Sequence, residues 1–257
     1  MDLIDTHAHL TFPELSGQLE AVLDRSRAVG VSRWITVCTG PEELDAVMNL
    51  ASGIDGMYAA LGFHPHDAAK MTQADMDRLY DLTGHDEVVA VGETGLDYHY
   101  MYSDADSQQR IFRAHLDIAV ERNKPVVIHT REAFDDTVRI LDEYTGRLKN
   151  VVIHCYGGDK AQTRLVLERG WYMSFTGTVT FKKADALREV VKLIPPDRVM
   201  VETDCPYISP EPMRKIRPNE PSLMVHTAAK LAEIYGMTLE KFAELVTTTS
   251  VDFFSLD

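Results

Sequence analysis

Short hydrophobic runs rich in Val and Ile recur along the whole chain, separated by longer stretches with helical spacing. Short apolar runs bounded by polar or turn residues are typical of buried strands. Apolar residues three and four positions apart, such as Phe112, Leu116 and Ala119, predict amphipathic helices between them. The predicted strands are residues 3–7, 34–38, 57–61, 88–92, 126–129, 151–154, 172–175 and 199–202.

The spacing of these eight predicted strands indicates how they are connected. Successive strands start 21 to 38 residues apart, close to the length of one strand–helix unit. Eight such units predict an α/β fold, the (β/α)8 TIM barrel, which we expect to be a single domain over residues 1–257. A doubly wound open sheet would need a glycine-rich phosphate turn after the first strand, where Asp5-Thr-His-Ala-His9 stands instead. Residues 209–221, with four prolines, are predicted to be a long ordered loop rather than a domain boundary.

The charge balance limits the partners of the protein. The 257 residues include 26 Lys and Arg against 40 Asp and Glu, a net charge of −14. This excludes a broad basic surface for nucleic acid, so any affinity for phosphate must be local. No apolar run approaches the length of about 18 to 20 residues that a membrane span needs, and the N-terminus lacks a signal-peptide pattern. Three well-separated cysteines fit a reducing compartment, so we expect a cytoplasmic protein that does not bind membranes.

Histidines and carboxylates stand where the predicted strands end. Asp5, His7 and His9 alternate along the first strand and therefore share one face. Taken alone, the two histidines fit a hydrogen-bonded structural pair as well as a metal site. However, five of the eight strands end in residue types that bind metals, and the carboxyl ends of barrel strands meet at one rim. This convergence predicts a metal site built from His7, His9, Glu93, His129, His154 and Asp204, with Asp97 and Glu202 nearby.

Six motifs that contain these residues follow one another along the chain. They are Asp5-Thr-His-Ala-His9, Gly62-Phe-His-Pro-His66, Gly92-Glu-Thr-Gly-Leu-Asp97, Pro125-Val-Val-Ile-His-Thr-Arg131, His154-Cys-Tyr-Gly157 and Glu202-Thr-Asp-Cys-Pro-Tyr207. Together they resemble the signatures of the TatD family of metal-dependent deoxyribonucleases, within the amidohydrolase superfamily. Residues 214–221 depart from that family's usual Arg-Gly-Lys-Arg-Asn-Glu-Pro, a difference that concerns substrate preference.

The resemblance implies a centre with two divalent metal ions. His7, His9 and Asp204 would hold one ion, His129 and His154 the other, and Glu93 would bridge them. Such a pair binds the oxygens of a phosphodiester and lowers the pKa of a bridging water, which attacks as hydroxide, with Asp204 as the general base. The imidazole-rich ligand set suits zinc, iron or manganese, whereas the family's activity is often associated with magnesium, so the metal stays open between Zn, Mn and Mg.

Further polar residues near the rim are candidates for contact with a substrate. His64 is the first of these, because a donor there would stabilise charge on the phosphoryl oxygens during catalysis. Glu202 either orients a metal ligand or is paired elsewhere, and both interpretations stay open. Cys155 and Cys205 directly follow proposed ligands and are expected to pack away from the site. The other candidates for phosphate contacts are His66, Arg131, Arg214, Lys215 and Arg217.

The resemblance implies a deoxyribonuclease that removes nucleotides from DNA ends as a 3′–5′ exonuclease. Because a strand end needs only a narrow electropositive pocket, an acidic protein is expected to prefer single-stranded DNA ends as its partner. The same ligands are consistent with hydrolysis of another ester or amide bond, as in an aminoacyl-tRNA deacylase or a small-molecule amidohydrolase. A barrel that binds metal without catalysis is a third possibility, against which Asp204 speaks, because such a protein needs no general base.

Overall fold

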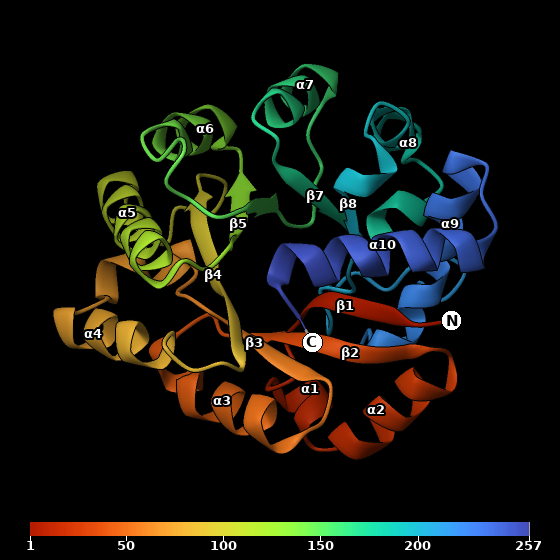
Figure 1. The fold of residues 1–257 in the computed structure, drawn as a ribbon, viewed down its shortest axis with the longest axis horizontal. Coiled ribbons are helices and arrows are strands. Elements are labelled where there is room, and N and C mark those ends of the chain that lie inside the picture. The colour runs from red at the N-terminus through yellow and green to blue at the C-terminus, as the bar shows by residue number, and fades with distance from the viewer. Residues whose placement is uncertain (257) are drawn as a thin grey trace. The chain divides into compact units, whose positions relative to one another are not determined.

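Every predicted strand is present, but the second strand begins at Val31 instead of residue 34, because Ser32 and Arg33 at its start are not buried and interrupt the apolar run. In residues 1–256, which the computed structural model describes, eight strands alternate with helices and follow one another in the sheet in chain order (Figure 1). This confirms the (β/α)8 topology. The strands are β1 (Leu3–Ala8), β2 (Val31–Val37), β3 (Met57–Leu61), β4 (Val88–Asp97), β5 (Val126–Arg131), β6 (Val151–Ile153), β7 (Tyr172–Phe175) and β8 (Val199–Val201).

The helices follow the predicted periodicity, with one exception near the N-terminus. The apolar pattern from Leu15 to Leu23 forms two helices, because Gly17 ends the first and Gln18 leaves helical geometry at φ −140° and ψ 29°. Glycine is a poor helix former, which explains the break. The helices are α1 (Pro13–Ser16), α2 (Leu19–Ala28), α3 (Leu44–Gly53), α4 (Gln73–Leu82), α5 (Ala105–Arg122), α6 (Phe134–Asp142), α7 (Lys160–Glu168), α8 (Asp185–Val191), α9 (Met224–Tyr235) and α10 (Leu239–Phe254).

The chain forms two compact units. The first comprises residues 1–36, 55–57 and 154–256, and the second comprises residues 37–54 and 58–153. In the first unit β1 pairs in parallel with β2, β7 pairs in parallel with β8, and Ala8 bridges Cys205 next to β8. In the second unit β3, β4, β5 and β6 pair in parallel in that order. Each unit therefore contributes a run of neighbouring strands whose carboxyl ends lie together.

Strand β4 is longer than predicted, because it continues past Gly92 to Asp97. Gly92 and Gly95 have φ values of 145° and 142°, in the region that favours glycine. A Cβ atom on Gly92 would lie 2.5 Å from the carbonyl oxygen of Val127, and one on Gly95 would collide with the carbonyl oxygen of His129. The two glycines therefore let β5 lie against β4, in a register that pairs Gly95 with His129.

The segment after β8 is an ordered loop, as the sequence predicts. Ser209 Oγ donates a hydrogen bond to the carbonyl oxygen of Ile216 at 2.6 Å, and the Asn219 side-chain amide donates to the carbonyl oxygen of Thr203 at 3.0 Å. Glu220 accepts two hydrogen bonds from the guanidinium of Arg25. The loop is therefore anchored at both its start and its end.

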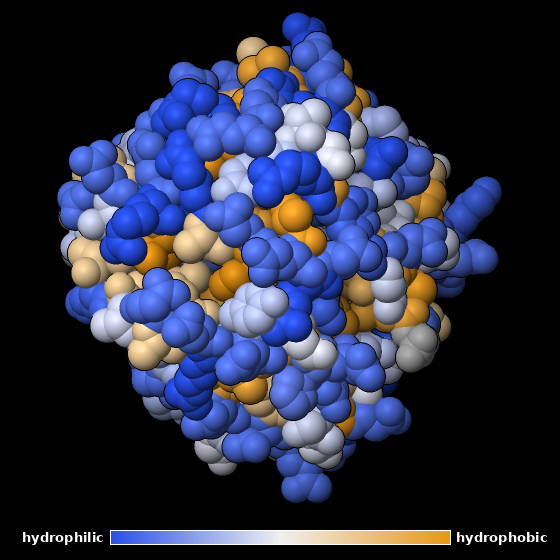
Figure 2. Space-filling view, turned by 60° about the vertical axis from the view of Figure 1, so that its left-hand side comes forward, coloured by the Kyte–Doolittle hydropathy of each residue, from blue (hydrophilic) through white to orange (hydrophobic). Residues whose placement is uncertain are grey.

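The molecular surface is largely hydrophilic on the face shown in Figure 2, and the hydrophobic residues on it form small separate patches. Among the described residues, we find no helix with the length and hydropathy required to span a membrane.

Candidate metal-binding clusters

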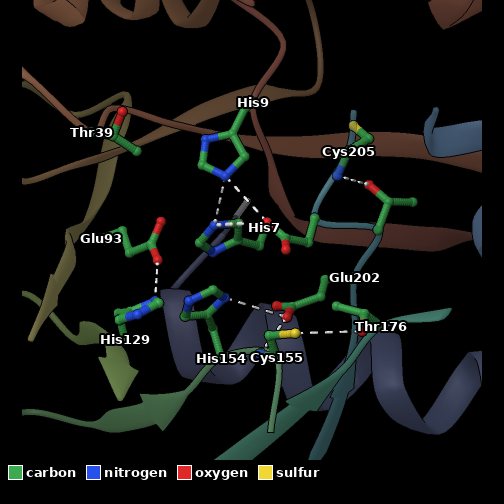
Figure 3. A network of polar contacts seen from close by, with 12 residues as sticks. His7, His9, Thr39, Glu93, His129, His154, Cys155, Thr176, Glu202 and Cys205 are labelled. Atoms are coloured by element: carbon green, nitrogen blue, oxygen red, sulfur yellow. Dashed lines mark hydrogen bonds and ion pairs between the residues drawn. The ribbon is translucent and has the colours of Figure 1, made fainter. Parts of the chain in front are cut away.

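The first cluster of candidate ligands belongs to the first unit and is called the His7 cluster: His7, His9, His154, Glu202 and Asp204. The Nε2 atoms of His7 and His9 are 3.3 Å apart, and His9 Nε2 lies 3.2 Å from Asp204 Oδ1. His7 Nε2 lies 3.8 Å from the same oxygen. The imidazole of His154 stacks on that of His7, with centroids 4.1 Å apart and planes 7° from parallel. Figure 3 shows the imidazoles of His7 and His9 turned toward each other.

These distances fit a bound metal ion. Imidazole and carboxylate ligands lie about 2.0 to 2.2 Å from zinc, which in tetrahedral geometry places neighbouring donor atoms about 3.3 to 3.6 Å from one another. The three donor atoms of His7, His9 and Asp204 are 3.2 to 3.8 Å apart. Only small shifts of these side chains would complete the coordination, so the donor set fits a divalent transition metal.

The backbone brings Asp204 to the histidines of β1. The backbone N–H of Asp204 donates to the carbonyl oxygen of His7 at 2.9 Å, and that of His9 donates to the carbonyl oxygen of Cys205 at 2.9 Å. Asp204 has a φ of 52°, an uncommon conformation for a residue with a side chain. Burial alone would raise the pKa of Asp204, but the hydrogen bond from His9 and the nearby imidazole of His7 bring it below its ordinary value. The carboxylate is therefore ionised at neutral pH.

Asp5 holds the segment next to Asp204 by hydrogen bonds. The sequence places it on one strand face with His7 and His9, but its carboxylate accepts hydrogen bonds from the backbone N–H and the hydroxyl of Thr203, at 2.9 and 2.6 Å. Burial raises the pKa of Asp5 to about 7. Asp5 thus positions the segment that carries Asp204.

Glu202 combines the two interpretations that the sequence leaves open. Its Oε1 atom accepts a 2.6 Å hydrogen bond from the backbone N–H of Cys155 and lies 3.6 Å from His154 Nδ1. Glu202 is thus paired with the backbone and also placed to orient His154. The Sγ atom of Cys155 lies 3.5 Å from the hydroxyl of Thr176 and points away from the histidines (Figure 3). Cys205 is buried, so both cysteines pack as the sequence predicts.

The second cluster belongs to the second unit and is called the His129 cluster: His64, His66, Glu93, Asp97 and His129. His129 Nδ1 lies 2.9 Å from Glu93 Oε1, and His129 Nε2 lies 3.1 Å from Asp97 Oδ2. Figure 3 shows the contact between Glu93 and His129. His64 Nε2 lies 3.7 Å from Glu93 Oε1. The carboxylate of Glu93 therefore meets one imidazole from β5 and one from the loop after β3.

Asp97 has a role that the sequence analysis did not assign. Its Oδ2 atom faces the Nε2 atoms of both His129 and His66 at 3.1 Å, and its Oδ1 atom accepts the backbone N–H groups of His99 and Tyr100 at 3.0 Å. Burial alone would raise the pKa of Asp97, but the hydrogen bonds from His129, Tyr100 and His66 hold it well below its usual range. A carboxylate on the far nitrogen of a histidine fixes the orientation of a metal ligand. The one feature of the sequence that points to this role of Asp97 is its place at the end of the Gly92 to Asp97 motif.

The contacts of His64 favour a hydrogen-bond donor over a metal ligand. Its Nδ1 atom accepts the backbone N–H of His66 at 3.2 Å, so in the neutral ring Nε2 carries the proton. The backbone next to it is held by His115, whose Nε2 accepts the N–H of Phe63 at 2.9 Å while its Nδ1 donates to the carbonyl oxygen of Ile111 at 2.7 Å. Burial lowers the pKa of His115 to about 4, so this histidine is a neutral structural support.

The cations predicted to contact phosphate lie on exposed segments. The guanidinium of Arg131 lies over the ring of Tyr100, 4.7 Å from its centroid, and that of Arg214 lies over Phe181 at 3.4 Å. Lys215 and Arg217 are exposed in the loop after β8. Stacking on an aromatic ring attracts and orients a guanidinium, whose N–H groups at the ring plane can still donate to a phosphate. The assignments of these residues to phosphate, and of His154 to the same ion as His129, stay predictions.

Comparison with known proteins agrees with this geometry. The family model described as TatD related DNase matches residues 4–255. A protein of Bacillus subtilis (strain 168), named uncharacterized metal-dependent hydrolase YabD, is 40% identical over 255 residues, which are 99% of this chain and 100% of the relative. The protein of Enterobacter lignolyticus (strain SCF1) named 3′-5′ ssDNA/RNA exonuclease TatD is 33% identical over 238 residues, 91% of this chain and 92% of the relative.

A solved structure extends the comparison to the fold. The crystal structure of YJJV, a TatD homolog from Escherichia coli K12, superimposes with a TM-score of 0.92 at 29% identity and covers 99% of this chain and 98% of that one. This match confirms the predicted TIM barrel. With the family model over almost the whole chain and a relative of 40% identity, the protein belongs to the TatD family and is a metal-dependent hydrolase of that family.

Proposed function

We propose that this hydrolase is a nuclease that uses two divalent metal ions to remove nucleotides from the 3′ end of single-stranded DNA. The observation that supports it best is the His7 cluster, where two imidazole nitrogens and one carboxylate oxygen lie 3.2 to 3.8 Å apart. Two relatives, 33% and 31% identical, are named 3′-5′ ssDNA/RNA exonucleases. The positive charge of two bound divalent ions would attract a phosphodiester, which is an anion.

The residues of the His7 cluster would bind metal and move a proton. Bound divalent ions supply positive charge for the phosphoryl oxygens and lower the pKa of a water molecule. His7, His9 and Asp204 present the donor atoms for one such ion. Because Asp204 meets both histidines through Oδ1, its Oδ2 atom is the oxygen that accepts a proton from the attacking water.

The residues of the His129 cluster would bind metal and stabilise charge. Asp97 contacts His129 at Nε2, so the Nδ1 atom faces Glu93 and is the nitrogen that would bind metal. The Nε2–H of His64, next to Glu93, would donate to a phosphoryl oxygen as negative charge develops there. Arg131, Arg214, Lys215 and Arg217 would hold neighbouring phosphates, together with His66.

Metal analysis tests the ligand assignment. If Glu93 bridges two ions, Glu93→Ala should lose both ions and nearly all activity while keeping its circular dichroism spectrum. The matched control is Glu132→Ala, which removes an exposed glutamate paired with His99. Elemental analysis of protein purified without chelator gives the number and identity of the ions. A Glu93→Ala protein that keeps two metal ions per chain would show that another group bridges them.

A substrate panel tests the reaction. Metal-loaded protein is incubated with a 3′-labelled single-stranded oligonucleotide, an aryl phosphodiester and an aryl ester. We expect the labelled 3′ nucleotide to be released first as a mononucleotide. Faster hydrolysis of the ester with an intact oligonucleotide would assign the protein to the hydrolases of other ester or amide bonds. The absence of turnover on all three substrates by the metal-loaded protein would contradict the proposed nuclease.

A further inference from the structure

The loop after β4 exposes two tyrosines beside the His129 cluster. The side chain of Tyr100 is 46% exposed and that of Tyr102 is 69% exposed. Their rings are nearly parallel, with centroids 5.4 Å apart and planes 9° from parallel. Flat exposed rings are the usual binding elements for unpaired nucleobases.

Arg131 adds a positive charge beside the two tyrosines. The guanidinium of Arg131 lies 4.7 Å from the centroid of the Tyr100 ring, and the ring of Tyr102 stacks on Tyr100. The imidazole of His66 lies edge-on to both tyrosines, at centroid distances of 5.4 and 4.9 Å. Because Tyr102 is the most exposed of these rings, it is the one that can take a further planar group. Arg131 adds attraction for a neighbouring phosphate.

Hydrogen bonds hold the loop at both ends. Asp97 accepts the backbone N–H of Tyr100 at 3.0 Å. Ser103, directly after Tyr102, donates its hydroxyl proton to the carbonyl oxygen of His66 at 2.7 Å, and its own carbonyl oxygen accepts the amide of Gln108 at 2.8 Å. The tyrosines are therefore preorganised, so little conformational entropy would be lost when a ligand stacks on them.

The side chain of Asp97 also connects the loop to the proposed reaction centre. Asp97 Oδ2 faces both His66 Nε2 and His129 Nε2 at 3.1 Å. His66 in turn contacts the ring of Tyr102. Thus a planar group on Tyr102 and a phosphate at His129 would lie within the span of one short ligand, and all the residues involved belong to the second unit.

We propose that Tyr102, supported by Tyr100 and Arg131, is a stacking platform for an unpaired nucleobase of the strand that is hydrolysed. This inference rests on the proposed nuclease function and adds the part of the substrate that the protein recognises. Stacking on a tyrosine ring tolerates any base, because every base has an aromatic face. A paired base is stacked within its duplex, so the platform selects single-stranded ends without a broad basic surface.

The test measures binding of an oligonucleotide with and without bases near its 3′ end. Single strands with hydrolysis-resistant phosphorothioate linkages carry either normal nucleotides or abasic residues at the last two positions, and fluorescence anisotropy gives the Kd for the metal-loaded protein. Wild type should bind the normal strand about tenfold more tightly than the abasic one. Tyr102→Leu should lose that difference by weakening only the binding of the normal strand, whereas Tyr102→Phe, which keeps the ring, should retain it.

A control and a second readout separate the possible outcomes. Leu193→Ala shortens another exposed hydrophobic side chain and should leave both Kd values unchanged. With hydrolysable strands, Tyr102→Leu should raise KM about tenfold and leave kcat unchanged, because stacking contributes equally before and during the reaction. Equal Kd values for both strands in wild type, or equal weakening of both by Tyr102→Leu, would overturn the platform even if the strands are cut. Base-dependent binding without cleavage would support the platform and contradict the nuclease.

Discussion

The His7 and His129 clusters contain the same kinds of side chain but pair them differently. In the His129 cluster each ring nitrogen of His129 faces a carboxylate, at 2.9 Å from Glu93 and 3.1 Å from Asp97. In the His7 cluster two imidazole nitrogens face each other at 3.3 Å and share one oxygen of Asp204. One cluster therefore pairs imidazole with carboxylate, and the other brings imidazoles together.

This difference determines how much each cluster depends on a cation. Only one proton fits between the facing nitrogens of His7 and His9, and protonation of both rings would place two positive charges in contact. A metal ion, which accepts lone pairs from both nitrogens, removes that conflict. In the metal-free protein both ring nitrogens of His129 can donate to the carboxylates that face them when the ring is protonated, so this cluster can be satisfied without a metal ion. We therefore expect the metal to stabilise the His7 cluster more than the His129 cluster.

The largest expected effect is on catalysis through the His7 cluster. Asp204→Asn keeps an oxygen near the metal but removes the proton acceptor. We expect metal to bind with reduced affinity and kcat to fall by about 10² to 10⁴. Steady-state hydrolysis of a single-stranded oligonucleotide and elemental analysis measure the two quantities. Turnover close to that of wild type would assign the base to another residue.

The same substitution in the His129 cluster should have a smaller effect. Asp97→Asn weakens the orientation of His129 without removing a proposed ligand or base. We expect a loss of about 10- to 100-fold in metal affinity or activity, the usual size for a residue that orients a metal ligand. Excess metal should restore part of the activity of Asp97→Asn, whereas the kcat of Asp204→Asn should stay low even when it is saturated with metal. An effect as large as that of Asp204→Asn would show that Asp97 has a direct part in catalysis.

Metal removal should separate the two clusters directly. Hydrogen exchange measured with and without a chelator reports the local opening of each segment. We expect exchange to accelerate about tenfold or more at the ends of β1 and β8, and less at the ends of β4 and β5. Readdition of metal should reverse the change. Equal acceleration in both regions would contradict the comparison.

The support of the His129 cluster by His115 predicts a pH dependence of stability. Its pKa is about 4 in the folded protein, below the ordinary value of 6.5. Between these values the unfolded chain binds more protons, so the free energy of unfolding should fall as the pH drops from about 6.5 to 4, by up to about 1.4 kcal/mol per pH unit. Urea unfolding at several pH values measures this slope. His115→Gln should flatten it, and His85→Gln, at an exposed histidine, should leave it unchanged.

The smallest expected effect concerns the cations of the loop after β8. Arg214→Glu combined with Arg217→Glu should raise KM severalfold and change kcat less, because these residues would hold phosphates away from the bond that breaks. For wild type, the plot of log affinity against log salt should be shallow, with a slope near 0.7 for each of about two or three phosphates. Lys192→Glu with Lys241→Glu makes the same change in net charge and serves as the control. A steep salt dependence would indicate a larger basic surface.

The hydrophobic pattern predicts the strands well where the information is local. The starts of all strands except β2 agree with the predicted starts, because an apolar run and the polar residue after it are adjacent in the chain. The end of β4 was predicted too early, because glycines normally interrupt strands. Here Gly92 and Gly95 allow close approach to β5, which is visible only when both strands are present.

The sequence by itself determined the order of strands and helices and the chemical type of the residues at the strand ends, since both depend on neighbours along the chain. Only the tertiary structure decided which of these side chains meet. It brought Asp97 into contact with His129, His115 with the backbone of Phe63, and Asp5 with Thr203. The residues in these three contacts are 32, 52 and 198 positions apart in the chain. Such pairs are set by strand register and by the direction of each side chain, which no local pattern encodes.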